Sequence, residues 1–152
     1  METDLMASLE QYLDYGVMGI LGFMSFLSLW IFIERLMFYK SMRFSDYQYK
    51  DMLELDLSNN LSGLSTIGAN APYVGLLGTV LGIMLTYYTL GDVGAVDAKK
   101  IMMGLALALK ATAFGLIVAI PAILFYTYLD RKLEKTLVMF DIEQKEKANE
   151  KA

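Results

Sequence analysis

The feature that most constrains this chain is an uncharged apolar run over residues 16–33. Beyond Glu34 and Arg35, mostly apolar residues continue to Tyr39. A helix needs about 20 apolar residues to span a bilayer, and this stretch is long enough. We therefore predict a first transmembrane helix over residues 16–39.

Two further apolar stretches follow, over residues 71–90 and 101–129, and the second of them is interrupted only by Lys110. At 1.5 Å per residue this last stretch would measure roughly 43 Å, so it must tilt, kink or protrude from a hydrocarbon core of roughly 30 Å. Hydrophobic residues make up 56% of the chain, above the roughly 45–50% of an ordinary soluble domain. We predict an all-α integral membrane protein with three transmembrane helices.

The remaining segments are more polar: an N-terminal segment (1–15), a connection (40–70), a short link (91–100) and a tail (130–152). Apolar residues at helical spacing run into the tail, with charges between them, at Leu129, Leu133, Leu137 and Phe140. The third helix is therefore expected to continue into water as an amphipathic rod. We expect long second and third helices that extend into the cytoplasm.

Lysine and arginine residues indicate the orientation, because the cytoplasmic flanks of membrane helices are enriched in them. Ten of the thirteen lie in the connection, counted from Arg35, and in the tail. We therefore expect a cytoplasmic C-terminus and an N-terminus on the outer side. A two-span alternative, with the first run peripheral, would place these two basic segments on opposite sides unless that run lay in the cytoplasmic interface. The charges therefore favour three spans.

The residues before the first run carry only negative charges, at Glu2, Asp4, Glu10 and Asp14. A secretory signal would begin with a positively charged region. We therefore expect the first run to stay in the mature protein, with residues 1–15 as a segment on the outer side.

The chain contains no cysteine and no histidine, and its net charge is −4. The missing residue types exclude thiol chemistry, disulfides, thiolate metal sites and the usual general base. The small net charge does not suggest nucleic acid as a partner. We expect neither an enzyme nor a nucleic-acid-binding protein, and no metal or organic cofactor.

Small and weakly polar residues recur on the second and third stretches at intervals of three and four, which gathers them on one face of each helix. On the second stretch these residues are Gly75, Gly78, Gly82, Thr86 and Thr89, with Thr79 beside them. The third stretch repeats the rhythm at Gly104, Ala108, Thr112, Gly115, Ala119 and Ala122.

Two interpretations of these faces are open. Small residues let helices approach closely where lipid offers no hydrophobic drive for association. The same faces can line a central channel, where threonine hydroxyls hold water or a carboxylate. Helical rise, counted from Ala71 and Ile101 at opposite membrane faces, puts Thr79 and Thr112 near one level. Both interpretations can hold together in a ring of subunits.

These residues carry a family resemblance. The segment 71–84, APYVGLLGTVLGIM, together with 108–122, ALKATAFGLIVAIPA, resembles the two signature helices of the ExbB/TolQ/MotA proton-channel family. The resemblance covers residues 67–141 well and the first helix more loosely. The short chain is more similar to the ExbB and TolQ branches than to MotA, whose members have four spans and a large cytoplasmic domain.

The resemblance implies a homo-oligomeric ring in the bacterial inner membrane, a pentamer in well-studied relatives, around a pair of single-span ExbD-like partner subunits. In that family a membrane aspartate of the partner carries the proton, and the two threonines matched here by Thr79 and Thr112 face it. The small residues expected to face this pore are Gly75, Gly78, Gly82, Gly104, Ala108, Gly115 and Ala119.

The ExbB and TolQ branches imply different functions, and protons are the coupling ion in both. An ExbB-like subunit would act on a TonB-like transducer to energise outer-membrane uptake, whereas a TolQ-type subunit would serve envelope maintenance in the Tol-Pal system. A passive membrane scaffold, whose helices merely pack, is a third hypothesis. A solute permease should show broken helices and midplane polar sites in corresponding repeats, and the sequence does not show them.

The sequence departs from the family pattern at Leu107, where many ExbB and TolQ chains carry a glutamate. The second and third spans then hold no carboxylate, so a proton relay has to rest on the partner's aspartate, water and the threonines. Lys110 is unusual because a lysine inside a span is costly and by default a functional candidate. We expect it to snorkel outward, to bind an anionic phospholipid head group or to pair across a subunit boundary.

The two prolines lie in the second and third spans. Pro72 is expected at the start of the second helix, where a missing amide hydrogen costs least. Pro121 matches the proline of the family's AIPA segment, and it would either bend the third helix through its lost hydrogen bond or serve packing.

Charged residues gather where the first and third spans reach the cytoplasmic side. Glu34 and Arg35 end the first span, and Asp130, Arg131 and Lys132 lie at the same level on the third. We expect a solvated interfacial cluster in which Arg131 and Lys132 meet lipid or a neighbouring subunit.

Overall fold

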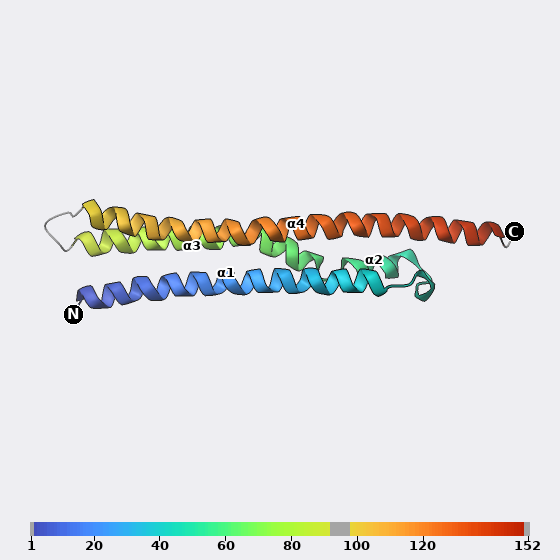
Figure 1. Cartoon of the computed structure of the whole chain (residues 1–152), viewed down its shortest axis with the longest axis horizontal. Helices are drawn as coiled ribbons and strands as arrows, with labels where there is room; N and C mark the ends of the chain where they lie inside the picture. Colours follow the sequence, from blue (N-terminus) through green and yellow to red (C-terminus); the bar gives the residue numbers. More distant parts are fainter. Residues whose placement is uncertain (1, 92–97, 151–152) are drawn as a thin grey trace.

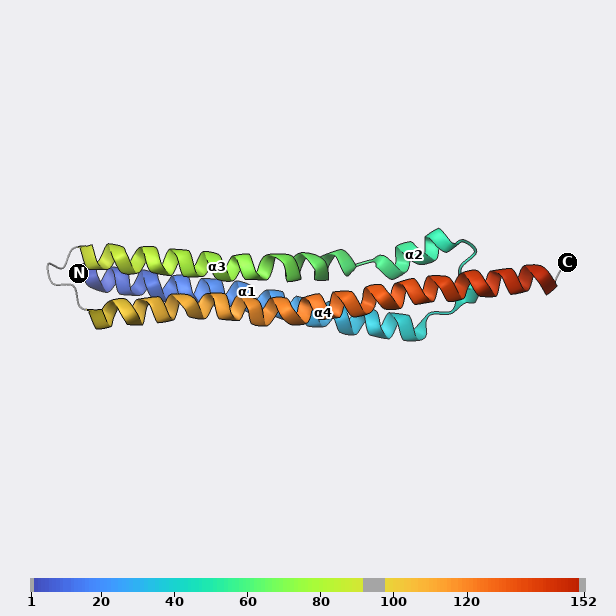
Figure 2. The same ribbon diagram turned by 90° about the horizontal axis from the view of Figure 1, so that it is seen from above.

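The computed structural model describes residues 2–91 and 98–150, and the regular elements in these ranges are all helical. They are α1 (Glu2–Ser41), a short 3₁₀ helix η1 (Phe44–Asp46), α2 (Lys50–Ser58), α3 (Leu61–Gly91) and α4 (Ala98–Glu150). Three long helices lie side by side, with the start of α1, the end of α3 and the start of α4 at one end of the molecule (Figures 1 and 2). Most of the expected link over residues 91–100 lies outside the described residues.

Three helical stretches are long and apolar enough to cross a membrane: Gln11–Ser41, Lys50–Tyr88 and Ile101–Glu150. The prediction of an all-α chain with three such helices is therefore confirmed. The expected continuation of the third helix beyond residue 129 is also confirmed, because α4 is one helix of 53 residues. Such a helix is about 80 Å long, so it cannot lie wholly within a hydrocarbon core of roughly 30 Å.

Two hydrophobic clusters, made of different residue types, hold the long helices together. Toward the end of the molecule that carries α2, bulky side chains form a leucine cluster from Tyr39, Leu53, Leu57, Leu61, Leu64, Leu129, Leu133, Leu137 and Phe140. Nearer the other end lies a second cluster, composed of Val17, Leu21, Ile67, Ala71, Ala111, Val118, Ala119 and Ala122. Burial of leucine stabilises packing in water, whereas close contact of small side chains is what helices use in lipid.

Pro72 was expected at the start of the second helix, and this expectation is wrong. Helix α3 begins at Leu61, and the proline lies inside it. A proline within a helix cannot donate to the carbonyl oxygen four residues earlier, here that of Gly68. Gly68 packs directly on α4, since a Cβ at this position would meet Cγ1 of Ile123 at 2.7 Å. Packing on α4 therefore stabilises this part of α3 despite the missing hydrogen bond.

Candidate functional site

The glycines of α3 bring its backbone against the backbone of α4. A Cβ built at Gly75 would meet the carbonyl oxygen of Ala111 at 2.7 Å and Cα of Gly115 at 3.1 Å. A Cβ at Gly115 would meet the carbonyl oxygen of Ala71 at 2.7 Å. Because the obstacles are backbone atoms, even a methyl group at either position would force the two helices apart.

The other small residues of the two faces continue this interface. Gly78 lies where three helices meet, because a Cβ there would meet Ala111 of α4 at 2.8 Å and Val17 of α1 at 2.9 Å. The residues expected to face a pore are all buried within the single chain: Gly75, Gly78, Gly82, Gly104, Ala108, Gly115 and Ala119. Close packing of α3 on α4 accounts for them, and their part in lining a pore stays a prediction about an assembly.

Two threonine hydroxyls meet in this interface. Thr79 is only 7% exposed, and its Oγ1 lies 3.0 Å from the carbonyl oxygen of Ala108 and within hydrogen-bonding contact of Oγ1 of Thr112. Each hydroxyl also lies near the carbonyl oxygen of Gly75, at 3.3 Å from Thr79 and 3.4 Å from Thr112. The structure therefore brings together the two threonines that the sequence analysis singled out.

The donors and acceptors of this pair leave capacity for one more group. Each hydroxyl has one hydrogen to donate and two lone pairs. When Thr79 donates to Ala108, Thr112 can donate to Thr79, and both lone pairs of the Thr112 oxygen remain unused. Thr112 is partly exposed, whereas Thr79 is buried. Thr112 is thus the member of the pair that can reach a group outside the chain.

Lys110 forms an ion pair inside the chain, a contact that the sequence analysis did not predict. Its Nζ lies 2.8 Å from Oδ2 of Asp14. The expected contact of Lys110 with lipid or a neighbouring subunit stays a prediction about an assembly in a membrane. Helix α1 begins at Glu2, and its early turns bring Asp14 beside α4.

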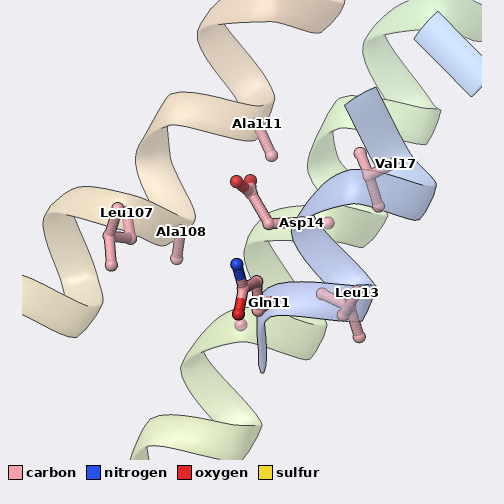
Figure 3. A pocket seen from close by; sticks show the side chains of 9 residues that line it. Gln11, Leu13, Asp14, Val17, Leu107, Ala108 and Ala111 are labelled. Atoms are coloured by element: carbon pink, nitrogen blue, oxygen red, sulfur yellow. The ribbon is translucent and has the colours of Figure 1, made fainter. Parts of the chain in front are cut away.

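A cavity of about 300 Å³ lies beside this ion pair, between α1, α3 and α4. Figure 3 shows the Asp14 carboxylate between α1 and α4, directed toward Ala111. The cavity wall consists of Gln11, Leu13, Asp14, Val17, Gly78, Gly82, Leu107, Ala108 and Ala111. Leu107 therefore presents an apolar wall to this space, and the carboxylate comes from the first helix.

Arg35 is 5% exposed, so it is not part of the solvated interfacial cluster that the sequence predicted. Its Nη2 donates to Oε1 of Glu34 at 2.7 Å, and its Nη1 donates to the carbonyl oxygen of Asp56 at 3.0 Å. Asn60, which adopts the left-handed conformation between α2 and α3, donates to Oε2 of Glu34 at 3.2 Å. Arg35 and Glu34 thus fasten the α2–α3 turn to α1.

The hydroxyl of Tyr47 adds a contact to the same turn. It donates to Oδ2 of Asp56 at 2.9 Å. Burial, together with this hydrogen bond to the carboxylate, raises the pKa of the Tyr47 hydroxyl. Asp56 therefore accepts hydrogen bonds both from Tyr47, in the segment between α1 and α2, and from Arg35 of α1.

Lys132 makes a contact within the chain, whereas the structure leaves Arg131 exposed. The Nζ of Lys132 lies 5.3 Å from the centre of the Tyr39 ring, within the range of a cation–π interaction. The expectation that Arg131 and Lys132 meet lipid or a neighbouring subunit stays a prediction for both residues. Pro121 lies inside α4, which continues on both sides of it.

The sequence analysis did not predict the contacts of Asp14 with Lys110 and of Arg35 with Asp56. A signal for Asp14 was present, because apolar residues continue upstream of the first run at spacings of four, at Leu5, Leu9, Leu13 and Val17. Such spacing extends a helical face. Arg35 had no comparable signal. Its burial depends on the α2–α3 turn, which packs on α1 although it lies more than 20 residues further along the chain.

Three long apolar helices, two of them joined through glycines around a pair of threonine hydroxyls, define an α-helical membrane protein with a polar site inside its span. Residues 31–142 match the MotA/TolQ/ExbB proton channel family. The chain belongs to this family, and the resemblance found in its sequence is confirmed.

Individual relatives extend the similarity over nearly the whole chain. The chain is 50% identical over 134 residues to the biopolymer transport protein ExbB of Aquifex aeolicus (strain VF5), covering 88% of this chain and 90% of the relative. It is 55% identical over 127 residues to the protein of that name from Helicobacter pylori (strain J99), covering 84% of this chain and 88% of the relative. A shorter match of 71 residues, 44% identical, links it to ExbB of Neisseria gonorrhoeae, with 47% of this chain and 32% of the relative covered.

Proposed function

We propose that this chain is an ExbB-like subunit of a proton-driven motor in the bacterial inner membrane. In this role it forms a homo-oligomeric ring, a pentamer, around ExbD-like subunits, and proton motive force is converted into work on a TonB-like transducer for outer-membrane uptake. Relatives named ExbB at about half identity, similar over most of their length, support this branch. The basic residues of the connection and tail support a cytoplasmic C-terminus and a periplasmic N-terminus.

The observation that carries the proposal is the contact between Thr79 and Thr112. Thr79 is held by the carbonyl oxygen of Ala108, so its position is fixed by the α3–α4 interface. Thr112 keeps unused lone pairs and is partly exposed. A polar group with spare acceptor capacity inside an apolar span is a site for another polar group, because lipid cannot satisfy it.

The pair can recognise both protonation states of a carboxyl group on a partner helix. A neutral carboxylic acid has a hydrogen to donate, and the free lone pairs of Thr112 accept it. A carboxylate can only accept, so Thr112 must turn its hydrogen away from Thr79 and toward the anion. Each proton that the partner binds or releases therefore changes the hydrogen bonding of Thr112.

This change gives the proton a mechanical consequence. A carboxylate is costly in a low-dielectric surrounding, whereas its protonated form is neutral and passes more easily along an apolar wall. Protonation from the outer side would release the partner helix from one subunit, and deprotonation on the cytoplasmic side would fix it at another. In this scheme the ring guides the partner, and the partner's carboxyl group carries the proton.

Valine variants test the proposal, because valine keeps the shape of threonine and removes its hydroxyl. We expect Thr79→Val and Thr112→Val to lose energised uptake while the complex with the ExbD-like partner still purifies intact. Thr127→Val is the matched control: within the part of the chain that the structure describes, this exposed threonine of α4 bonds to the carbonyl oxygen of Ile123 one turn earlier, at 2.8 Å. Retained uptake in both Thr79→Val and Thr112→Val would favour a passive scaffold.

A TolQ-type role in envelope maintenance is the second candidate, because the matched family includes TolQ. The relatives named ExbB favour the first branch. Complementation separates the two branches. We expect this chain, expressed with the ExbD-like partner of its own organism, to restore uptake to cells lacking ExbB and not envelope integrity to cells lacking TolQ.

A further inference from the structure

The ion pair between Asp14 and Lys110 lies within two helices that are apolar enough to span a membrane. Asp14 falls in the stretch Gln11–Ser41 and Lys110 in Ile101–Glu150. The two side chains are 34% and 40% exposed, and Nζ lies 2.8 Å from Oδ2. Charges inside a span are costly and are functional candidates by default, and the threonine site does not account for this pair.

The neighbouring cavity has room for water beside the pair. Its volume of about 300 Å³ is room for several molecules, since a water occupies about 30 Å³ in the liquid. Of the described residues on its wall, Asp14 is the ionisable one and Gln11 adds an amide, while the rest are apolar or glycine. Water in this space would therefore gather at the carboxylate.

The same cavity adjoins the threonine site. Ala108 lines the cavity, and its carbonyl oxygen accepts the hydrogen bond of Thr79. Gly78, which directly precedes Thr79, also lines the cavity. Lys110 precedes Thr112 by two residues, a rise of about 3 Å along α4. The ion pair thus lies at nearly the depth of the threonines, on the side from which α1 and α4 begin (Figure 1).

We propose that Asp14 is a proton-binding carboxylate, through which protons from water on the N-terminal side reach the threonine level. This inference rests on the proposed proton-driven function. A hydronium ion in the cavity gives its proton to Oδ2 of Asp14: one O–H bond breaks in the hydronium ion, one forms on the carboxyl group, and water remains. Lys110 keeps its own proton and loses its counter-ion, and release of the proton to water restores the pair.

The surroundings of Asp14 fit a reversible site. From α4 it faces the ammonium group of Lys110, whose Nζ lies 2.8 Å from Oδ2 of Asp14. From α1, Gln11 lines the same cavity and its Nε2 donates to the hydroxyl of Tyr15 at 3.3 Å. The described α3 residues on the wall, Gly78 and Gly82, bring no charge. Two states are therefore available: a closed ion pair, and a neutral acid beside a free ammonium group.

Infrared difference spectroscopy tests the proton site in the purified full chain, reconstituted in phospholipid vesicles. We expect a carboxyl band that appears as the pH is lowered and is lost in Asp14→Asn. The control is Asp141→Asn, because Asp141 also pairs with a lysine, Lys50, at 2.5 Å and similar exposure, yet lies about 60 Å along α4 from Ile101. The control should keep the band assigned to Asp14. An unchanged spectrum in Asp14→Asn would overturn the proposal.

Energised uptake by the whole complex separates a proton site from a simple clamp between helices. We expect Asp14→Glu, which keeps a carboxyl group, to retain uptake and Asp14→Asn to lose it. The double variant Asp14→Asn with Lys110→Gln keeps a neutral hydrogen-bonding pair and should also lose uptake. Full uptake in the double variant would overturn the proposal. If Thr112→Val still abolished uptake in that case, the proposed motor function would stand without this site.

Discussion

Gly75 and Gly115 face each other across α3 and α4 so closely that a Cβ at position 75 would lie 3.1 Å from Cα of Gly115. This close approach lets the hydroxyls of Thr79 and Thr112 meet one turn away. The glycines are therefore a condition for the threonine site, because wider spacing of the two helices would separate its two halves.

Gly75→Ala should destabilise the chain by about 1–3 kcal/mol, the usual cost of overpacking a tight contact. The added methyl would meet backbone atoms of α4, which cannot turn aside as a side chain can. Thermal unfolding in detergent measures the effect. Gly22→Ala is the control, since a Cβ at Gly22 of α1 meets nothing within 4 Å. Equal melting temperatures for the two variants would contradict the close α3–α4 contact.

Arg35→Met should loosen the α2–α3 turn, because it removes the donor that satisfies the carbonyl oxygen of Asp56. Leaving such a group unsatisfied costs about 1–3 kcal/mol. Hydrogen exchange of residues 56–61 should become faster, while exchange in the middle of α3 stays slow. Arg43→Met provides the comparison, because Arg43 is exposed. The same exchange rates in both variants would mean that Arg35 does not hold the turn.

Asp141→Asn should change stability by less than about 1 kcal/mol, although Asp141 lies only 2.5 Å from Nζ of Lys50. Both side chains are more than 40% exposed, and an exposed pair gains little against water and salt. Thermal unfolding at low and high salt should show a small difference that salt removes. A large loss that persists in salt would indicate that α2 depends on this pair to stay on α4.

The sequence allowed the prediction of those parts of the fold that depend on local pattern. Three apolar stretches gave the number of long helices, and the spacing of small residues gave the faces on which α3 and α4 meet. Helical rise along the two opposed stretches placed Thr79 and Thr112 near one level. Each of these steps needs only helical period and rise.

The features that were missed depend on contacts between distant segments. Asp14 and Lys110 are far apart in the chain. Their pairing requires α1 to begin well before residue 16, and the charged residues at the start of the chain did not indicate a helix there. Pro72 looked like the first turn of a helix because polar residues precede it, yet packing of Gly68 on α4 extends α3 upstream. The burial of Arg35 likewise depends on where the α2–α3 turn folds back.

The central claim is that Thr112 faces the membrane aspartate of a partner helix at the centre of a ring. Site-specific cross-linking tests it directly, because the chain has no cysteine of its own. Thr112→Cys introduces a single thiol, to be paired with a cysteine at the aspartate of the co-purifying single-span partner. Ile117→Cys is the control, since Ile117 of the same helix is 61% exposed and should face lipid or a neighbouring subunit.

We expect oxidation to form the disulfide-linked product from Thr112→Cys and not from Ile117→Cys in the intact complex. Absence of the product from Thr112→Cys, with the complex assembled and the Ile117→Cys variant linked instead, would contradict the account.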